Sequence, residues 1–178
     1  MTSSATLDIW EAIARDAARE SSLWCDALAA NARPEPVFSP LGEERFALGL
    51  ETIYEGYLVH YGTPRLFTPP DPDTALLLGD YLYAHGLVRI ADFGDVGAVA
   101  DLSELISLCS QLRAEDADGD GALWAATAAL LGRGVLHDAR AALRLHGQAG
   151  RLLAAAVDAA GRAELDRALA RHAGRIRA

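Results

Sequence analysis

Residues 51–67 read ETIYEGYLVHYGTPRLF, and this stretch indicates the class of fold. Its apolar side chains recur every three or four positions, as they do along one face of an α-helix. Gly62 and Pro64 then stop such a helix and prevent it from resuming nearby. Glu51 and Glu55 stand four residues apart and therefore share one side of the helix. Two like charges at this spacing indicate either a solvated stripe or a bound cation.

The same periodicity extends over most of the chain and predicts an all-α, single-domain helical bundle. Alanine and leucine dominate and β-branched residues are scattered, so we expect no strand. We expect one long amphipathic helix within residues 1–33, a helical core over residues 43–133 and short helices over residues 134–178. Residues 74–94 are apolar nearly all round, which is typical of the central helix of a bundle. Asp71 and Pro72 are suited to cap and start that helix.

Composition and charge exclude several classes of function. The formal net charge of the 178 residues is −9, which disfavours nucleic acid as a partner because phosphate binding needs clustered cations. All 16 basic residues are arginine, so chemistry that depends on a lysine, such as a Schiff base, is excluded. The longest uncharged run is too short to span a membrane. Cys25 and Cys109 are expected to be reduced, buried thiols, and the absence of a secretory leader predicts a cytoplasmic protein.

Asp80 stands out because its neighbours on both sides, in LLLGDYLYAHGL, are apolar. A carboxylate on a buried helix is costly unless it is paired or hydrogen-bonded. We therefore expect Asp80 to be buried and hydrogen-bonded across a helix–helix contact. Gly79 beside it lowers helix propensity, which predicts that another backbone approaches closely there.

Residues 76–95 and the following VADLSELISLC resemble the polyprenyl (trans-isoprenyl) diphosphate synthases, in which a Gly-Asp pair lies on a central apolar helix. Upstream, that family carries an aspartate-rich motif followed at a fixed distance by Arg-Arg-Gly-x-Pro. Gly62 and Pro64 match the end of this segment, and the family's arginine pair then falls on His60 and Tyr61. In the same register the aspartate positions fall on Glu51, Thr52 and Glu55. The resemblance covers roughly residues 48–132 and implies part of the isoprenoid synthase fold.

In such enzymes the aspartates hold magnesium ions, and basic residues grip the diphosphates of the substrates. Here one acid is Thr52, the arginine pair is missing, and no second aspartate-rich motif follows. The resemblance therefore implies a non-catalytic relative that binds an apolar, isoprenoid-like ligand, or an accessory subunit in a homo- or hetero-oligomer. No cofactor is expected, and Mg²⁺ would be needed only with a diphosphate ligand. The candidate ligand-binding residues are Glu51, Glu55, Asp80, His60 and Arg65, and the first two are also candidate metal ligands.

The acidic turn DADGDG offers a second candidate metal site. Asp116, Asp118 and Asp120 occupy the first, third and fifth positions of a calcium-binding EF-hand loop, but Thr127 stands where the loop needs a bidentate glutamate. The alternative is an ordinary turn in which Asp118 or Asp120 caps the next helix. Two other functions thus stay open beside the non-catalytic one: a residual isoprenyl diphosphate enzyme and a calcium-responsive helical module.

Overall fold

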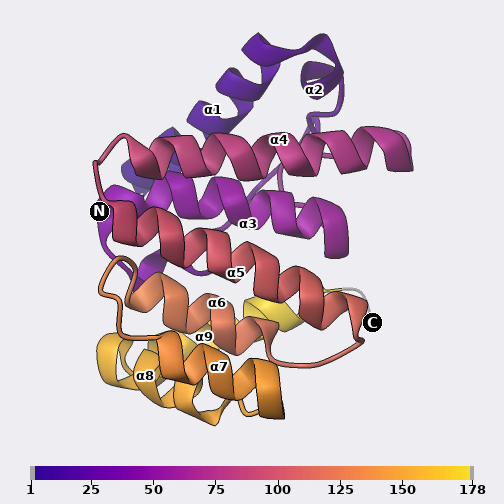
Figure 1. Cartoon of the computed structure of the whole chain (residues 1–178). Helices are drawn as coiled ribbons and strands as arrows, with labels where there is room; N and C mark the ends of the chain where they lie inside the picture. The colour runs from indigo at the N-terminus through magenta and orange to yellow at the C-terminus, as the bar shows by residue number, and fades with distance from the viewer. Residues whose placement is uncertain (1–2, 177–178) are drawn as a thin grey trace.

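The computed structural model describes residues 3–176, and within this range the chain is all-α, as predicted. The described residues form nine α-helices and two short 3₁₀ turns, without a named strand (Figure 1). They are α1 (Ser3–Glu20), α2 (Ser22–Asp26), η1 (Ser39–Leu41), η2 (Glu44–Phe46), α3 (Ala47–Tyr61), α4 (Pro72–Ala91), α5 (Val96–Ala114), α6 (Asp120–Ala129), α7 (His137–His146), α8 (Gly150–Ala160) and α9 (Arg162–Ala173).

The central helix is α3, and the prediction of a central helix over residues 74–94 is wrong. Nearly every residue of α3 is buried, because α4 and α1 pack on one side and the η1 turn, α5 and α6 lie toward the other (Figure 1). By contrast, Leu76, Leu77 and Val88 of α4 each expose more than half of their surface. Helix α4 therefore lies at the outside of the bundle although its sequence is strongly apolar.

Glycines let α3 and α4 approach each other closely. A Cβ atom added to Gly56 would lie 2.9 Å from the carbonyl oxygen of Gly79, and one added to Gly86 would lie 3.0 Å from that of Gly49. The two backbones do approach closely here, but the missing side chain of Gly79 itself makes room for the His60 ring rather than, as was expected, for another backbone. The two glycines of each helix are seven residues apart, so they lie on one face of that helix. They give the antiparallel helices two points of close contact.

The N-terminal region is not one continuous helix. The structure breaks it at Ser21, whose side-chain oxygen accepts a hydrogen bond from the Leu23 backbone N–H at 3.1 Å and so caps α2. The local capping bond competes with helix continuation at this point. Cys25, on α2, is exposed and only Cys109 is buried, so the expectation of two buried thiols is half wrong.

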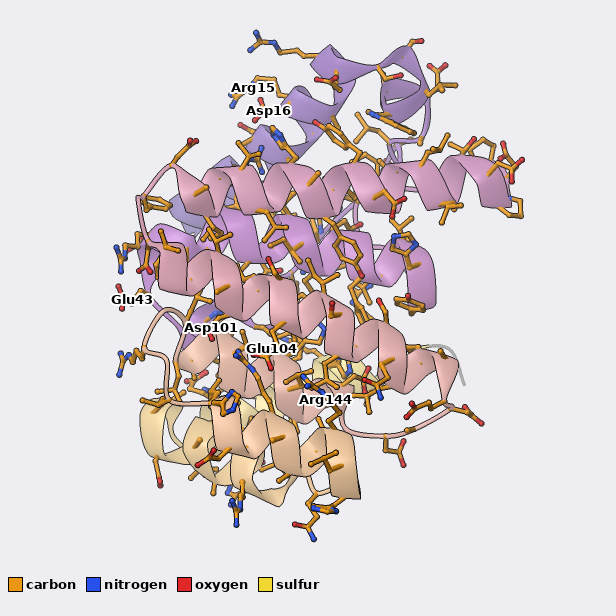
Figure 2. The ribbon with its side chains drawn as sticks, in the orientation of Figure 1. Arg15, Asp16, Glu43, Asp101, Glu104 and Arg144 are labelled. Carbon is orange, nitrogen blue, oxygen red and sulfur yellow. The ribbon has the colours of Figure 1, made fainter. Side chains whose placement is uncertain are left out.

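Buried ion pairs hold the C-terminal helices against α5. The Arg140 guanidinium on α7 lies 2.7 Å from the Asp101 carboxylate on α5 and also donates to the Thr127 hydroxyl on α6 at 3.2 Å. Beside it, Glu104 accepts a hydrogen bond from Arg144 at 3.2 Å, and Figure 2 shows these two side chains between α5 and α7. Residues 134–178 were expected as short helices, and α7, α8 and α9 agree with this.

The loop between α3 and α4 joins distant parts of the chain. Its residues 62–68 pair with residues 27–29 through an isolated bridge between Leu28 and Phe67. They also pair with residues 175–176 through a bridge between Gly62 and Ile176. The loop thereby holds residues 27–29 and the C-terminal end of the described chain against α3.

Candidate functional site

The partner of the two glutamates on α3 is an internal cation, Arg65, supplied by that loop. Its Nε lies 2.9 Å from Glu55 Oε2, and its Nη1 lies 2.5 Å from Glu51 Oε2. All three side chains are at most 1 % exposed. The structure therefore decides between the two predictions for this pair: the glutamates are not a solvated stripe, and the cation they bind belongs to the protein.

Every carboxylate oxygen of the pair has a donor. The second oxygen of Glu51 accepts the backbone N–H groups of Val37 and Ser39, both at 3.1 Å. The second oxygen of Glu55 accepts the N–H groups of Arg65 and Leu66 at 2.8 and 2.7 Å. A metal ion could bind here only by displacing these donors, so Glu51 and Glu55 act as anchors for two loops.

Aromatic rings complete the environment of Arg65. The guanidinium carbon lies 4.5 Å from the ring centre of Trp10 on α1 and 4.8 Å from that of Tyr54 on α3. Burial by itself lowers the pKa of Arg65, but the charges of Glu51 and Glu55 outweigh it and raise that pKa above its usual value. The cluster is a fixed, permanently charged unit with no surface open to a ligand.

The acidic turn does not assemble a calcium site either. Asp116 adopts a left-handed backbone conformation (φ 52°) and, like Asp118, faces the solvent. Asp120 instead points inward and is buried. Gly119, rather than Asp118 or Asp120, takes the cap position of α6. Within residues 3–176 no group of three or more His, Cys, Asp or Glu side chains is placed to hold a metal ion.

Asp120 belongs to a buried polar network that the sequence analysis missed. One of its oxygens accepts hydrogen bonds from the Tyr57 hydroxyl and from Arg113, and lies 3.1 Å from Nε2 of His172. The other ring nitrogen of His172 lies 2.9 Å from the Tyr54 hydroxyl. Burial opposes the charge on Asp120, but these hydrogen bonds outweigh it and hold the pKa of that carboxyl well below its usual value.

The network joins α3, α5, α6 and α9 across separations of up to 118 residues. The only local signal was Asp120 itself, an acid at the start of an otherwise apolar helix. Neither Asp120 nor His172 lines a described cavity. The arrangement therefore fastens α9 to the core, and we assign it no chemistry.

Asp80 is exposed, so the prediction that it is buried is wrong. Its side chain is 67 % exposed, yet it does reach across the helix pair, because Oδ1 lies 3.3 Å from Nε2 of His60 on α3. His60 is 12 % exposed, and burial lowers its pKa below the usual 6.5 although Asp80 opposes this shift. His60 therefore favours its neutral form more strongly than a free histidine does.

His60 lines a groove that has a volume of 620 Å³. The groove runs between the end of α3, the following loop and the start of α4, and its lining is mainly apolar: Val59, Pro64, Phe67, Pro69, Pro70, Pro72, Ala75 and Leu76, with His60, Thr63, Thr68 and Asp71 as its polar members. Hydrogen bonds from Thr74 lower the pKa of Asp71, which stays negatively charged. Glu51, Glu55 and Asp80 do not line this groove, so the candidate residues do not converge on one site.

Comparisons with known proteins add no relative to this geometry. The chain matches no protein-family model and no curated protein, and its fold matches no solved structure. Among residues 3–176, no helix combines the length and the hydrophobicity needed to cross a membrane.

Proposed function

We propose that the chain is a non-catalytic helical protein that binds an uncharged, isoprenoid-like ligand in the groove beside His60. The lining of this groove carries the proposal. Its volume of 620 Å³ lies within the range of roughly 300–1,000 Å³ that is usual for small-molecule sites, and its lining combines eight apolar residues with four polar ones.

Charge limits the ligand to an uncharged one. Among its lining residues the groove has one negative side chain, Asp71, and no arginine. A diphosphate would meet repulsion there, whereas a hydroxyl can hydrogen-bond to a neutral His60 ring or to the hydroxyls of Thr63 and Thr68. The apolar remainder of a prenyl alcohol would lie on Phe67 and Leu76. The isoprenoid class itself rests on the resemblance of residues 48–132 to the prenyl synthases.

The buried cluster on α3 supports the absence of catalysis. Enzymes of the prenyl synthase type need several cations at the departing diphosphate. Here Glu51 and Glu55 are committed to Arg65, and Arg65 is committed to them. Neither a magnesium ion nor a diphosphate has a free partner in this cluster.

Titration of ¹⁵N-labelled protein with farnesol and with farnesyl diphosphate tests the proposal. Farnesol should shift the amide signals of residues 59–76 in a saturable way, and the diphosphate should bind more weakly with or without Mg²⁺. Leu76→Ser should weaken farnesol binding, whereas Leu77→Ser should not, because both leucines are 56 % exposed but only Leu76 lines the groove. Tighter binding of the diphosphate with Mg²⁺, or chain-elongated product on adding a homoallylic diphosphate, would support the residual enzyme instead.

The outer face of α4 favours a second candidate function, that of an accessory subunit that pairs with a second copy of this chain. Leu77 and Val88 are 56 % and 57 % exposed, and Ala84 and Ala91 lie between and beyond them on the same face. Two chains of charge −9 repel each other, so exposed apolar side chains are where they can meet, and Asp80 is the charged group beside them on this face. Sedimentation velocity of the wild type and of Val88→Asp tests this: dimers that the substitution dissociates support it, and a monomeric wild type excludes it.

A further inference from the structure

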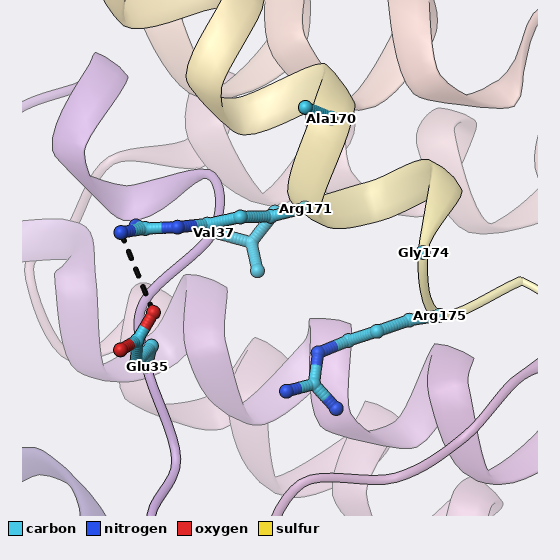
Figure 3. A pocket seen from close by; sticks show the side chains of 6 residues that line it. All are labelled: Glu35, Val37, Ala170, Arg171, Gly174 and Arg175. Carbon is cyan, nitrogen blue, oxygen red and sulfur yellow. Dashed lines mark ion pairs between the residues drawn. The ribbon is translucent and has the colours of Figure 1, made fainter.

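A second, smaller pocket lies at the end of α9 and is lined by two arginines. It has a volume of 220 Å³ and lies between the last turn of α9 and the segment before η1 (Figure 3). Its lining consists of Glu35, Val37, Ala170, Arg171, Gly174 and Arg175. In Figure 3 the side chain of Arg171 runs past Val37 to Glu35, and Arg175 extends from the following turn toward the same segment.

Hydrogen bonds to backbone carbonyls hold both guanidinium groups. Nη1 of Arg171 donates to the carbonyl oxygen of Pro36 at 2.9 Å. Nη1 of Arg175 donates to that of Thr63 at 3.4 Å, and the Thr63 backbone N–H donates to the Arg175 carbonyl at 2.7 Å. These bonds position the two cations before a ligand arrives, so less conformational entropy is lost on binding.

The two positive charges are only partly balanced. Arg171 pairs with Glu35 at 3.4 Å, and the Glu35 side chain is 68 % exposed, which makes this a weak surface pair. In the part of the chain that the structure describes, no carboxylate lies within 4.0 Å of the Arg175 guanidinium. The lining therefore carries one net positive charge in a protein whose net charge is −9.

Arginines in the last turn of a helix also stabilise the helix dipole, and this role alone would leave them pointing into solvent around the helix end. Arg171 instead crosses to the segment at Pro36, which lies 135 residues earlier in the chain. Val37 beneath it is 2 % exposed and gives the pocket an apolar floor.

We propose that this pocket binds a small monocarboxylate, with its carboxylate on the guanidinium group of Arg175 and a short apolar tail on Val37. Guanidinium groups bind carboxylates through paired N–H donors. One negative charge neutralises the lining, whereas a dianionic phosphate would leave an excess negative charge next to Glu35. The volume of 220 Å³ restricts the tail to a few carbon atoms. This site shares no lining residue with the groove beside His60.

Amide chemical-shift titration of the whole chain with butyrate tests the proposal, and butyramide, the neutral analogue of the same shape, is the control ligand. Butyrate should produce saturable shifts at residues 35–37 and 170–175, butyramide should not, and inorganic phosphate should bind more weakly than butyrate. Arg175→Gln should weaken butyrate binding by roughly tenfold, the usual scale for losing a charge-assisted hydrogen bond. Glu35→Gln should strengthen it, because it removes the competing carboxylate.

Arg167→Gln is the control variant, because Arg167 is an arginine of α9 that is 57 % exposed and does not line the pocket. It should leave butyrate binding unchanged. The proposal is overturned by butyramide that binds as well as butyrate, by phosphate that binds more tightly, by absence of a saturable shift, or by an Arg167→Gln effect as large as that of Arg175→Gln.

Discussion

Helices α3 and α4 are antiparallel neighbours of similarly apolar composition, yet they differ sharply in burial. Helix α3 carries two glutamates and a threonine among its buried residues, whereas α4 contains three consecutive leucines of which two are exposed. The small difference in composition therefore does not account for how much more of α3 is buried. The difference lies in the partners that each helix finds on its two sides.

Ion pairs and hydrogen bonds with other elements allow the polar side chains of α3 to be buried. Arg65 from the loop neutralises the two glutamates, and Arg89 from α4 donates to the Thr52 hydroxyl at 2.5 Å while pairing with Asp16 of α1 at 2.6 Å. For α4, only the face that carries Leu78, Leu82 and the two glycines has such partners.

Loss of Arg65 should produce the largest effect. Arg65→Met leaves two carboxylates buried without a cation and should lower the free energy of unfolding by about 3–5 kcal/mol. Urea unfolding at pH 7 measures this. Arg162→Met, which removes an exposed cation 3.9 Å from Asp166, is the control and should cost less than about 1 kcal/mol. An equally small loss for Arg65→Met and Arg162→Met would contradict the role assigned to Arg65.

Substitution of a glycine at the contact between α3 and α4 should cause the second-largest loss of stability. Gly56→Ala would place a methyl group 2.9 Å from a backbone carbonyl on α4, and such overpacking costs about 1–3 kcal/mol, partly offset by up to about 1 kcal/mol of helix propensity. Gly150→Ala on α8 meets nothing within 4 Å and should be neutral or stabilising. Thermal unfolding compares the two, and equal midpoints would show that the helix pair can separate without cost.

The pair formed by His60 and Asp80 should have a smaller effect, visible mainly in its pH dependence. Burial lowers the pKa of His60, so the unfolded chain binds more protons than the folded one at slightly acidic pH. The stability that the folded protein gains from keeping His60 neutral is present above pH 6.5. It is lost as the pH falls toward the pKa that His60 has in the folded state. Asp80→Ala should change stability by less than about 1 kcal/mol at pH 7 and should lower the pKa of His60 further, since Asp80 raises it. NMR titration of the imidazole protons measures the shift, and a rise would contradict the assigned contact.

The smallest effect is expected on the outer face of α4. Leu77→Ser should change the stability of the monomer by no more than about 0.5 kcal/mol because the side chain is already exposed. The adjacent Leu78→Ser should cost at least as much as a Leu→Ala change in a core, about 2–5 kcal/mol, since Leu78 is fully buried. Similar losses for both, measured by urea unfolding, would place α4 inside the bundle after all.

Local signals in the sequence were enough to predict much of the helix layout. Gly62 ends α3, and Asp71 caps α4 by accepting the Thr74 N–H at 2.8 Å, as the sequence predicted. The break at Ser21 was missed because the apolar stripe runs on across it, although a serine is a usual cap. Residues that cap or end a helix act over a few positions, so they can be recognised in a single sequence.

The candidate sites were harder to predict because their partners are distant or act in an unexpected role. Arg65 was named, but as a ligand-binding residue rather than as the partner of Glu51 and Glu55. Nothing near Asp120 indicates His172, which lies 52 residues away in the chain. Asp80 was judged by its sequence neighbours, whereas its exposure depends on which faces of α4 are covered.

The pairing of residues 62–63 with residues 175–176 has a consequence for the order of events on the ribosome. The Thr63 backbone finds its partner only after 112 further residues have been made. Helix α3 can meet Arg65 and α4 early in synthesis, but the outer edge of its loop stays unpaired until α9 has emerged and docked. A nascent chain stalled before α9 would therefore expose that backbone edge, and strand-like pairing with another nascent chain would compete with the correct closure.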